Sequence, residues 1–482
     1  MVLDNRLLRA GSGARRRPHR RLSSSMNNAG WHTAFLDSRD GRPLQGGVRR
    51  VLALAALVAT LGVPSPGVAQ PGGPAAASLG WLRAQIVPND RVPAPDPQRR
   101  GLILSYAPAG TPPGPLHRKS FVYDAALAAI AFTSTGDWAA ATRILQALAR
   151  VQRDDGTFWF SYAVDVAWPA EADHDMGIVR AGASAWVGQA LTFYLERRPA
   201  GDARVQRERA LLLAAARRAA DGLLGLRVPG PSAARGLVRG GRGLVRLEVE
   251  PGGTGVREVY DDRPIQWIST EHNLTTWFFL TALHGLTGEP RYAAAAREIQ
   301  ERLLDRVWQE DLGQFAQGVL EDGRLDRRLA LDCASWGALF LLAVGERDRA
   351  ARAAQTADRG YQSADGGVAG HRPYLDRPVY DDPEVQRRLL PEAAAARWEG
   401  LPFVWSEGSL GVALALARLG EGGRARAIVT EVLKLRAGSG IRLASRALPY
   451  EFAADPSVAG TAWHVLVEEA LRAPAAPGLW WR

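Results

Sequence analysis

Apolar and polar positions from about residue 120 onward form two kinds of segment. Segments of the first kind are apolar nearly all round, and they predict helices over 123–133, 183–195, 271–286, 332–344, 407–419 and 461–471. Segments of the second kind carry apolar residues at three- and four-residue steps, as Tyr292, Ala295 and Ile299 do. They predict amphipathic helices over 138–151, 205–226, 291–308, 347–357 and 423–435. Helices that are apolar on all faces belong in an inner layer, and one-sided helices belong outside it.

The two sets of helices alternate along the chain and predict a closed ring. One outer position has no helix in these sets, and a short helix near Trp81 fills it. Turns rich in glycine or aromatics at 154–162, 311–315 and 364–367 predict short β-hairpins on one rim. The expected fold is all-α, an (α/α)6 toroid of six helical hairpins over residues 118–475. An open helical solenoid is the alternative, but repeats of variable length with loops of about 30 residues favour a closed ring.

The N-terminal part of the chain has the pattern of an exported protein. Residues 1–48 are expected to be a disordered or untranslated leader. Arg49 and Arg50 precede an apolar run over 51–63, and a small-residue exit follows at 67–69. A positive start, a short apolar middle and small residues at the exit are the parts of a secretory signal. We therefore expect a signal peptide over 49–69 and a periplasmic or secreted protein.

Membrane insertion is not expected after signal cleavage. The apolar run is too short to span a hydrocarbon core of about 30 Å, and no second long apolar run follows it. Residues 70–117 contain two stretches rich in Pro and Gly, and we expect them to be a linker and a segment packed on the surface of the ring.

Charge and cysteine content exclude several classes of function. The formal net charge is +10, but residues 1–50 alone carry +8, so the other 432 residues are nearly neutral and nucleic acid is not an expected partner. The single cysteine, Cys333, excludes a disulfide framework, and the eight histidines form no metal-ligand pair. We expect no metal and no cofactor. The sequence makes no prediction of the oligomeric state.

Acidic and aromatic residues recur where the inner helices begin. All inner helices of such a ring run in the same direction, so these ends meet on one face, where the helix dipoles favour anions. Capping explains any single acid, but several ends carry an acid among tryptophan and tyrosine, which is typical of sugar binding. The candidate positions are Tyr123, Asp124, Glu271, His272, Asn273, Asp332, Trp336, Trp405, Glu407 and Trp463, with Arg180 and the acidic triplet 173–175 before the second inner helix.

These motifs give the chain a resemblance to a known group of folds. Thr270-Glu271-His272-Asn273-Leu274 opens one inner helix, and Trp405-Ser406-Glu407-Gly408 opens another. Over about residues 118–475 the chain resembles the six-hairpin glycosidase superfamily, most closely its exported bacterial members of unassigned activity. The resemblance implies a polysaccharide or oligosaccharide substrate and catalysis by a pair of carboxylates.

Cleavage of a glycosidic bond requires a protonated carboxylic acid and a carboxylate that activates water or attacks the sugar. Glu407 is the candidate acid, because its aromatic neighbours raise a carboxyl pKa. Glu271 is the candidate base, with Asp124 and Asp332 as rivals or sugar-positioning residues. Folds of this kind commonly invert, so we expect the two carboxyl groups to be roughly 6.5–9.5 Å apart. Replacing either glutamate by glutamine should shift stability little, since an acid at a helix end contributes about 0.3–1 kcal/mol.

The expected substrate-binding residues are Tyr123, His272, Asn273, Trp336, Trp405, Trp463 and Arg180. Two other classes of function remain open. One is a non-catalytic glycan-binding scaffold for exopolysaccharide export. The other is a polysaccharide lyase or sugar epimerase on the same fold, for which Tyr123, Tyr260, Arg180 and His272 would form the cleft.

Overall fold

The computed structural model describes residues 74–108, 115–166, 177–253 and 255–473. The leader and signal peptide expected over 1–69 and the acidic triplet 173–175 lie outside these residues. Within the described ranges, no helix combines the length and hydropathy needed to cross a bilayer.

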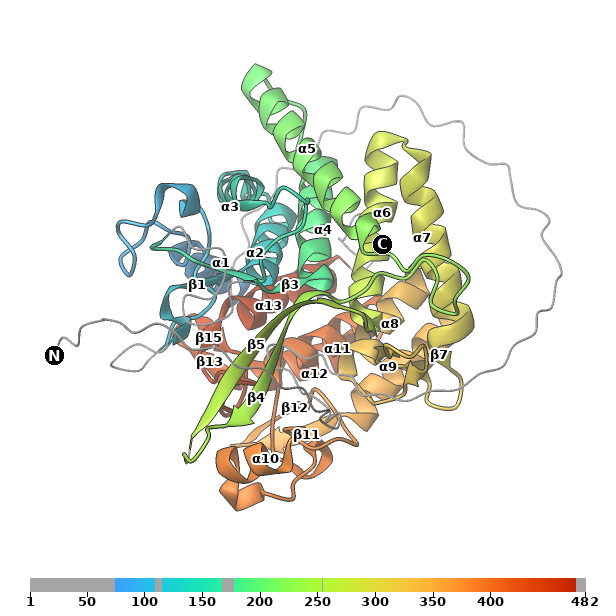
Figure 1. The fold of residues 1–482 in the computed structure, drawn as a ribbon. Helices are drawn as coiled ribbons and strands as arrows, with labels where there is room; N and C mark the ends of the chain where they lie inside the picture. Colours follow the sequence, from blue (N-terminus) through green and yellow to red (C-terminus); the bar gives the residue numbers. More distant parts are fainter. Residues whose placement is uncertain (1–73, 109–114, 167–176, 254, 474–482) are drawn as a thin grey trace, which may run out of the picture.

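Six helices form the inner layer, and nearly all of their residues are buried. Each packs against the next, and the last returns to the first, so the ring is closed (Figure 1). In chain order they are α2 (Val122–Ser134), α4 (Ala181–Arg197), α6 (Thr270–Thr287), α8 (Leu331–Ala343), α11 (Ser406–Arg418) and α13 (Val458–Arg472). The all-α toroid is confirmed, because helices without a polar face can be buried only when they have neighbours on every side.

The outer layer packs one helix against each inner helix and buries a single apolar stripe. Following the inner order from α2 to α11, the outer helices are α3 (Trp138–Val151), α5 (Ala203–Gly225), α7 (Pro290–Arg302), α9 (Arg347–Gly360) and α12 (Gly422–Val432). The helix expected near Trp81 is α1 (Pro74–Ala84), which packs on α13 and completes the ring. Short turns extend α7 over Leu303–Val307 and α12 over Leu433–Leu435.

Short strands join the helical hairpins on one rim. Two of the three predicted hairpins form, β7 (Trp308–Gln309) with β8 (Gln314–Phe315), and β11 (Gln362–Asp365) with β12 (Val368–His371). The third does not form locally, because β2 (Ser161–Ala163) pairs with β1 (Lys119–Phe121), the segment that leads into α2. The other small sheets contain β6 (Ile268–Ser269), β9 (Gly318–Val319) and β10 (Leu325–Asp326), and β13 (Arg436–Ala437), β14 (Gly440–Arg442) and β15 (Pro456–Ser457).

A long β-hairpin that was not predicted from the sequence crosses the face where the inner helices begin (Figure 1). It consists of β4 (Gly241–Val249) and β5 (Val256–Ile265), and β4 also pairs with β3 (Val179–Arg180). Its sequence signal is the alternation of buried Val245 and Leu247 with the charged residues between and after them. The hairpin contacts α10 (Pro383–Leu389), which lies in the connection between α9 and α11.

The segment before the ring is buried more deeply than surface packing implies. Leu102, Ile103 and Leu104 are fully buried in the main core, and Ile103 bridges Ile86 at the end of α1. This segment is therefore part of the core that anchors α1. Short 3₁₀ turns at Pro97–Arg99, Pro115–Arg118, Pro391–Ala393 and Trp398–Gly400 lie in the longer connections.

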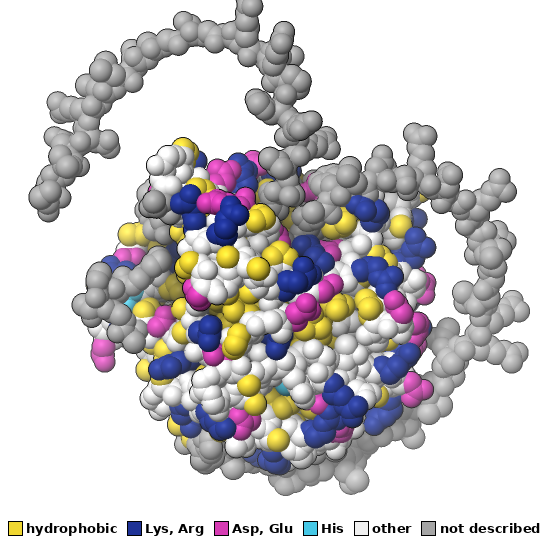
Figure 2. Space-filling view, turned by 90° about the horizontal axis from the view of Figure 1, so that it is seen from below, with side chains coloured by type: hydrophobic (Ala, Val, Ile, Leu, Met, Phe, Trp, Pro, Cys, Tyr) yellow, Lys and Arg dark blue, Asp and Glu magenta, His cyan; other side chains and the backbone are white. Residues whose placement is uncertain are grey.

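The surface agrees with the nearly neutral charge of the chain beyond residue 50. Figure 2 shows Lys and Arg side chains interspersed with Asp and Glu over the face seen from below. This face does not form the continuous basic surface that nucleic-acid binding uses.

Candidate active site

The N-terminal ends of the six inner helices border one cavity of about 740 Å³. A cavity of this size is typical of a small-molecule site. Every inner helix contributes to its lining, with Tyr123 and Asp124 from α2, Ala183 and Trp186 from α4, Glu271 and His272 from α6, Asp332 and Trp336 from α8, Glu407 from α11, and Ala459 from α13. The ring thus brings together four carboxyl groups that are far apart in the sequence.

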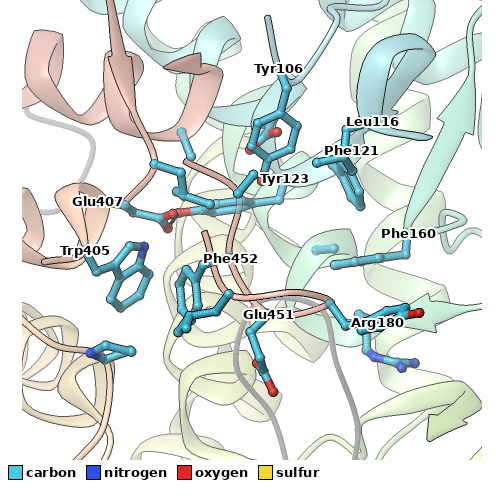
Figure 3. Close-up of a pocket in the computed structure, with 18 of the residues that line it drawn as sticks. Tyr106, Leu116, Phe121, Tyr123, Phe160, Arg180, Trp405, Glu407, Glu451 and Phe452 are labelled. Atoms are coloured by element: carbon cyan, nitrogen blue, oxygen red, sulfur yellow. Dashed lines mark hydrogen bonds between the residues drawn. The ribbon is translucent and has the colours of Figure 1, made fainter. Parts of the chain in front are cut away.

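Glu407 lies in the first turn of α11 and is 6% exposed. The Tyr123 hydroxyl donates a hydrogen bond to Glu407 Oε1 (Figure 3). Trp463 Nε1 donates to that hydroxyl at 3.0 Å. Burial raises the pKa of Glu407 well above its ordinary value, while the hydrogen bond from Tyr123 opposes the rise and nearby Asp332 adds to it. Glu407 is therefore held in place by a chain of two donors and is strongly biased toward its protonated form.

Glu271 lies in the first turn of α6, with different partners. Trp186 Nε1 donates to Glu271 Oε1 at 3.2 Å, and the Thr275 hydroxyl lies 3.4 Å from the same oxygen. Burial raises the pKa of Glu271 to about 8. His272 Nε2 is 3.8 Å from Glu271 Oε2, but burial lowers the pKa of His272 to about 3, so the imidazole is neutral and forms no ion pair.

The two aspartates differ in the hydrogen bonds that their carboxyl groups make. Asp332 Oδ1 is buried and has no hydrogen-bond partner, and burial together with the nearby Glu271 carboxyl raises the Asp332 pKa well above its ordinary value. Burial raises the pKa of Asp124 to about 7, and its hydrogen bond with Ser105 opposes the rise. Burying a carboxyl oxygen without a hydrogen-bond partner is costly. Asp332 Oδ1 is therefore well placed to accept a hydrogen bond from a hydroxyl group of a ligand.

Helix capping does not account for these acids. The cap of α6 is Ser269, whose hydroxyl accepts a hydrogen bond from the His272 backbone N–H at 3.4 Å. At α2 and α11 the cap positions are aromatic and make no side-chain cap bond. The carboxyl groups of Glu271 and Glu407 instead accept hydrogen bonds from side chains of other inner helices, Trp186 of α4 and Tyr123 of α2.

An aromatic cluster forms the floor of the cavity. The rings of Trp336 and Trp463 stack with centroids 5.7 Å apart and an interplanar angle of 14°. Trp186 packs edge-on against both rings, at 5.4 and 6.2 Å. Trp186 and Trp336 line the cavity, while Trp463 is fully buried beneath them. Trp463 therefore supports the floor and the Tyr123 hydroxyl, and it is not placed to stack on a ligand.

Of the other expected substrate-binding residues, Asn273 is the one that the structure places elsewhere. Its amide donates to the carbonyls of Val238 at 3.0 Å and Ser269 at 2.8 Å, and it accepts from the Val238 N–H at 2.8 Å. These bonds fasten α6 to the segment before β4, so its predicted contact with substrate is not supported. Tyr123, His272, Trp336, Trp405 and Arg180 all line the cavity.

Arg180 lies at the end of β3, directly before α4. Its Nη1 donates to the carbonyls of Val179 at 3.1 Å, Arg242 at 3.0 Å and Gly243 at 2.9 Å. The guanidinium is therefore committed in part to holding the base of the β4–β5 hairpin.

Several lining residues were not found from the sequence. Trp186 lies within a predicted inner helix, where an apolar residue gives no signal of its own. Others come from connections, and Figure 3 shows Glu451 and Phe452 on one such loop opposite Tyr106 and Phe121. No periodic pattern marks these loop residues, because their place in the cavity depends on how the connections fold over the ring.

The part of the chain that the structure describes contains no group of three or more His, Cys, Asp or Glu residues arranged to hold a metal ion. The four carboxyl groups are spread around the ring, and both glutamates are bound by side-chain donors. The chemistry that this arrangement offers is proton transfer between carboxyl groups and a ligand rich in hydroxyl groups.

These features define a class, an (α/α)6 toroid with a buried, carboxyl-lined cavity at the N-terminal ends of its inner helices. No protein-family model and no curated protein matches the sequence. Solved structures do match, and the chain has the six-hairpin glycosidase-like fold.

A glycosidase variant in complex with glucose is 13% identical with a TM-score of 0.54, covering 83% of this chain and 96% of that one. A D-mannose isomerase is 12% identical with a TM-score of 0.52, covering 83% and 96%. An uncharacterized conserved protein from Thermus thermophilus is 16% identical with a TM-score of 0.52, covering 82% of this chain and 100% of that one. At these identities the likeness shows the fold alone.

Proposed function

We propose that this protein is a carbohydrate-active enzyme, a glycoside hydrolase that uses Glu407 as general acid and Glu271 as general base. The observation that carries the proposal is the meeting of two buried, differently partnered glutamates in one cavity floored by tryptophan. Indole faces stack on the apolar faces of sugar rings, and carboxyl groups bind their hydroxyls. Glycosidases need two carboxyl groups in different protonation states.

The different surroundings of the two glutamates supply those states. Burial and the nearby Asp332 raise the pKa of Glu407 well above its ordinary value, so Glu407 holds the proton that is given to the leaving oxygen as the C1–O bond breaks. Glu271 accepts hydrogen bonds from Trp186 and Thr275, which oppose the rise in pKa that burial causes, so Glu271 becomes a carboxylate as the pH approaches 8. The carboxylate takes a proton from a water molecule, whose oxygen bonds to C1 on the opposite face of the sugar. The Glu407 charge also raises the pKa of Glu271, so ionisation of one glutamate disfavours ionisation of the other.

The structural neighbours support this assignment at the level of residue type. Solved structures of the glycosidase with the same fold include variants in which one of two glutamates or a tyrosine is replaced. Glu407, Glu271 and the Tyr123 that binds Glu407 are residues of these types in the present cavity.

A polysaccharide lyase is less well supported. Lyases neutralise a uronic acid carboxylate, and a cationic cleft serves that purpose. The cations among the lining residues are Lys119 and Arg180, against six acids, and His272 is neutral. Tyr260, expected in such a cleft, donates its hydroxyl to Asp262 at 3.0 Å and does not line the cavity.

A sugar isomerase is the second candidate, because a D-mannose isomerase shares the fold and the cavity has the volume of a small-sugar site. Paired carboxyl groups can also move a proton between adjacent sugar carbons. An isomerase would convert free monosaccharides and would leave glycosidic bonds intact.

The experiment is to incubate the protein with neutral and acidic glycans and free monosaccharides, and to measure reducing ends, ultraviolet absorbance of unsaturated products, and sugar interconversion. We expect reducing ends without unsaturated products, and inversion at C1 by NMR. Unsaturated products would establish a lyase, and interconversion alone would establish an isomerase. Glycan binding without any turnover would establish the scaffold for exopolysaccharide export.

We also propose that the enzyme acts outside the cytoplasm, because its N-terminal region has the pattern of a secretory signal. Mass spectrometry of the protein from its native host should place the mature N-terminus near Gln70. A cytoplasmic protein that retains residues 49–69 would overturn this proposal.

A further inference from the structure

The β4–β5 hairpin crosses the cavity mouth from one side of the ring to the other. It begins and ends beside α4 and α6, since β4 pairs with β3 before α4 and β5 ends just before β6 and α6. In the ring order α4 lies opposite α11. A strand of nine residues spans about 30 Å at ~3.4 Å per residue.

The far end of the hairpin is fastened to the connections that precede α11 and α13. Arg388 Nη1 in α10 donates to the Gly253 carbonyl at 3.2 Å. The Tyr450 hydroxyl, in the loop before α13, donates to the Val256 carbonyl at 2.7 Å. The same loop is also bound by the segment just before α10, because the Tyr380 hydroxyl donates to the Pro449 carbonyl at 2.6 Å. The hairpin, α10 and the 447–453 loop therefore form one connected cover.

This cover forms part of the cavity wall. Glu258 of β5 and Leu389 of α10 line the cavity, together with loop residues Tyr450, Glu451 and Phe452 (Figure 3). Leu247 of the hairpin is buried in the main core, so the hairpin is packed in place. Tyr450 has a φ of 62°, a left-handed conformation that bulky residues rarely adopt and that here is held by its contacts.

We propose that this cover makes the cavity a pocket for the end of a glycan chain or for a short oligosaccharide, and that a long chain cannot lie across it. The inference rests on the proposed hydrolase function and names its substrate class. A chain cleaved at an internal bond needs an open groove with two exits, whereas the hairpin lines the cavity through Glu258 and joins the α4–α6 side of the ring to α10 and the 447–453 loop. The volume of about 740 Å³ also fits a few sugar units rather than a long segment.

A binding experiment tests this without turnover. The full-length Glu407→Gln protein is titrated with linear malto-, cello- and manno-oligosaccharides and with the corresponding long polymers, and tryptophan fluorescence reports binding to the indole floor. A pocket for chain ends gives half-saturation at a constant molar concentration of chains, whatever their length. Half-saturation at a constant concentration of sugar units would overturn the inference.

A turnover experiment adds two variants that loosen the cover. One replaces residues 246–259 by an Asn-Gly turn, and the other is Tyr450→Phe, which removes only the bond to Val256. On the polymer that the wild type cleaves, viscosity should fall slowly for each reducing end released. Each variant should lower KM for that polymer, by about tenfold for the shortened hairpin, and make viscosity fall faster for each reducing end released. Tyr292→Phe on α7 is the matched control and should change neither value.

The outcomes separate the two claims. Rapid loss of viscosity in the wild type means internal cleavage and overturns the inference, while the hydrolase function stands. Neither binding nor cleavage of any glycan overturns the hydrolase function and the inference together. If the shortened hairpin fails to fold, Tyr450→Phe still decides whether the cover limits access.

Discussion

Two glutamates in one helical hairpin have opposite electrostatic surroundings. Glu431 on outer helix α12 accepts hydrogen bonds from Lys434 Nζ at 2.7 Å and from the Ala369 N–H at 2.9 Å, and these bonds lower its pKa. Glu407 on inner helix α11 is buried among aromatic side chains, and burial raises its pKa well above the ordinary value. In the outer layer this residue type is a charged group that binds surface partners, and in the inner layer it is a buried acid with a raised pKa. The layer and the end of the helix set this difference, because the N-terminal end of α11 lines the cavity and Glu431 does not.

The largest effect that tests this comparison is loss of turnover. Glu407→Gln and Glu271→Gln keep side-chain size and remove the titratable group, so each should lower kcat by at least ~10²-fold on the glycan that the wild type cleaves. Steady-state kinetics measures this, and Glu431→Gln is the matched control that should retain wild-type kcat.

Variants of the two aspartates show which result would contradict this assignment. If Asp332→Asn or Asp124→Asn abolishes turnover while both glutamine variants retain it, the two glutamates are not the acid and base. Intact folding of each variant is checked by circular dichroism.

Tyr123→Phe should have the next largest effect. It removes the donor that stabilises the carboxylate which Glu407 becomes on giving up its proton, and a hydrogen bond to a charged group is worth about 1.5–3 kcal/mol. We expect kcat to fall by about tenfold or more and the alkaline limb of its pH profile to move to higher pH, since this bond lowers the Glu407 pKa. A purely structural role for Tyr123 predicts an unmoved pH profile.

A pH-dependent stability follows from burial of the acids. The pKa of Glu271 rises from 4.5 to about 8 on folding, so its neutral form is the one that the fold accepts. Stability is then highest below about pH 4.5 and is lost as the pH rises toward 8, at about 1.4 kcal/mol for each unit of pKa shift. This differs from the expectation that replacing either glutamate by glutamine would shift stability little, which counted only the interaction of the acid with the helix end.

Denaturant unfolding at several pH values measures this effect. Glu271→Gln should lose less stability than the wild type between pH 5 and pH 8, by on the order of 4 kcal/mol. Glu431→Gln should keep the wild-type slope over that range, since the pKa of Glu431 lies below its ordinary value. An identical slope in Glu271→Gln and wild type would show that Glu271 is not buried as a neutral acid.

The smallest effect is expected for the exposed ion pair of Glu431 on outer helix α12. Lys434→Ala removes the ion pair with Glu431, whose side chain is 31% exposed, and pairs of this kind contribute about 0.3–0.5 kcal/mol. Thermal unfolding should change by no more than that amount, with kcat unchanged. A loss as large as that of a buried pair would mean that α12 is not an outer helix in solution.

Much of the fold could be predicted because its signal is local. The helix expected over 138–151 is α3 with the same bounds, and the inner helix expected over 271–286 begins one residue earlier as α6. Periodicity of three to four residues depends only on neighbours in the sequence. The meeting of the acids at one mouth followed from the parallel direction of the inner helices, and all four carboxyl groups line the cavity.

The failures concern contacts between distant segments. The strand Ser161–Ala163 pairs with Lys119–Phe121 rather than with its own neighbours, and Asn273 turns to Val238 rather than to the cavity. The β4–β5 hairpin had a visible alternation, but its path across the mouth is fixed by Tyr450 and Arg388, which are more than a hundred residues away.

The sequence by itself therefore determined the helices, their division into two layers and the end of the ring at which the acids gather, because burial pattern and chain direction are carried by short-range periodicity. Only the tertiary structure decided which acid binds which donor, how far burial shifts each pKa, and what covers the cavity. Those properties depend on the packing of connections and side chains from different hairpins. Their energies come from contacts between residues that no local pattern relates.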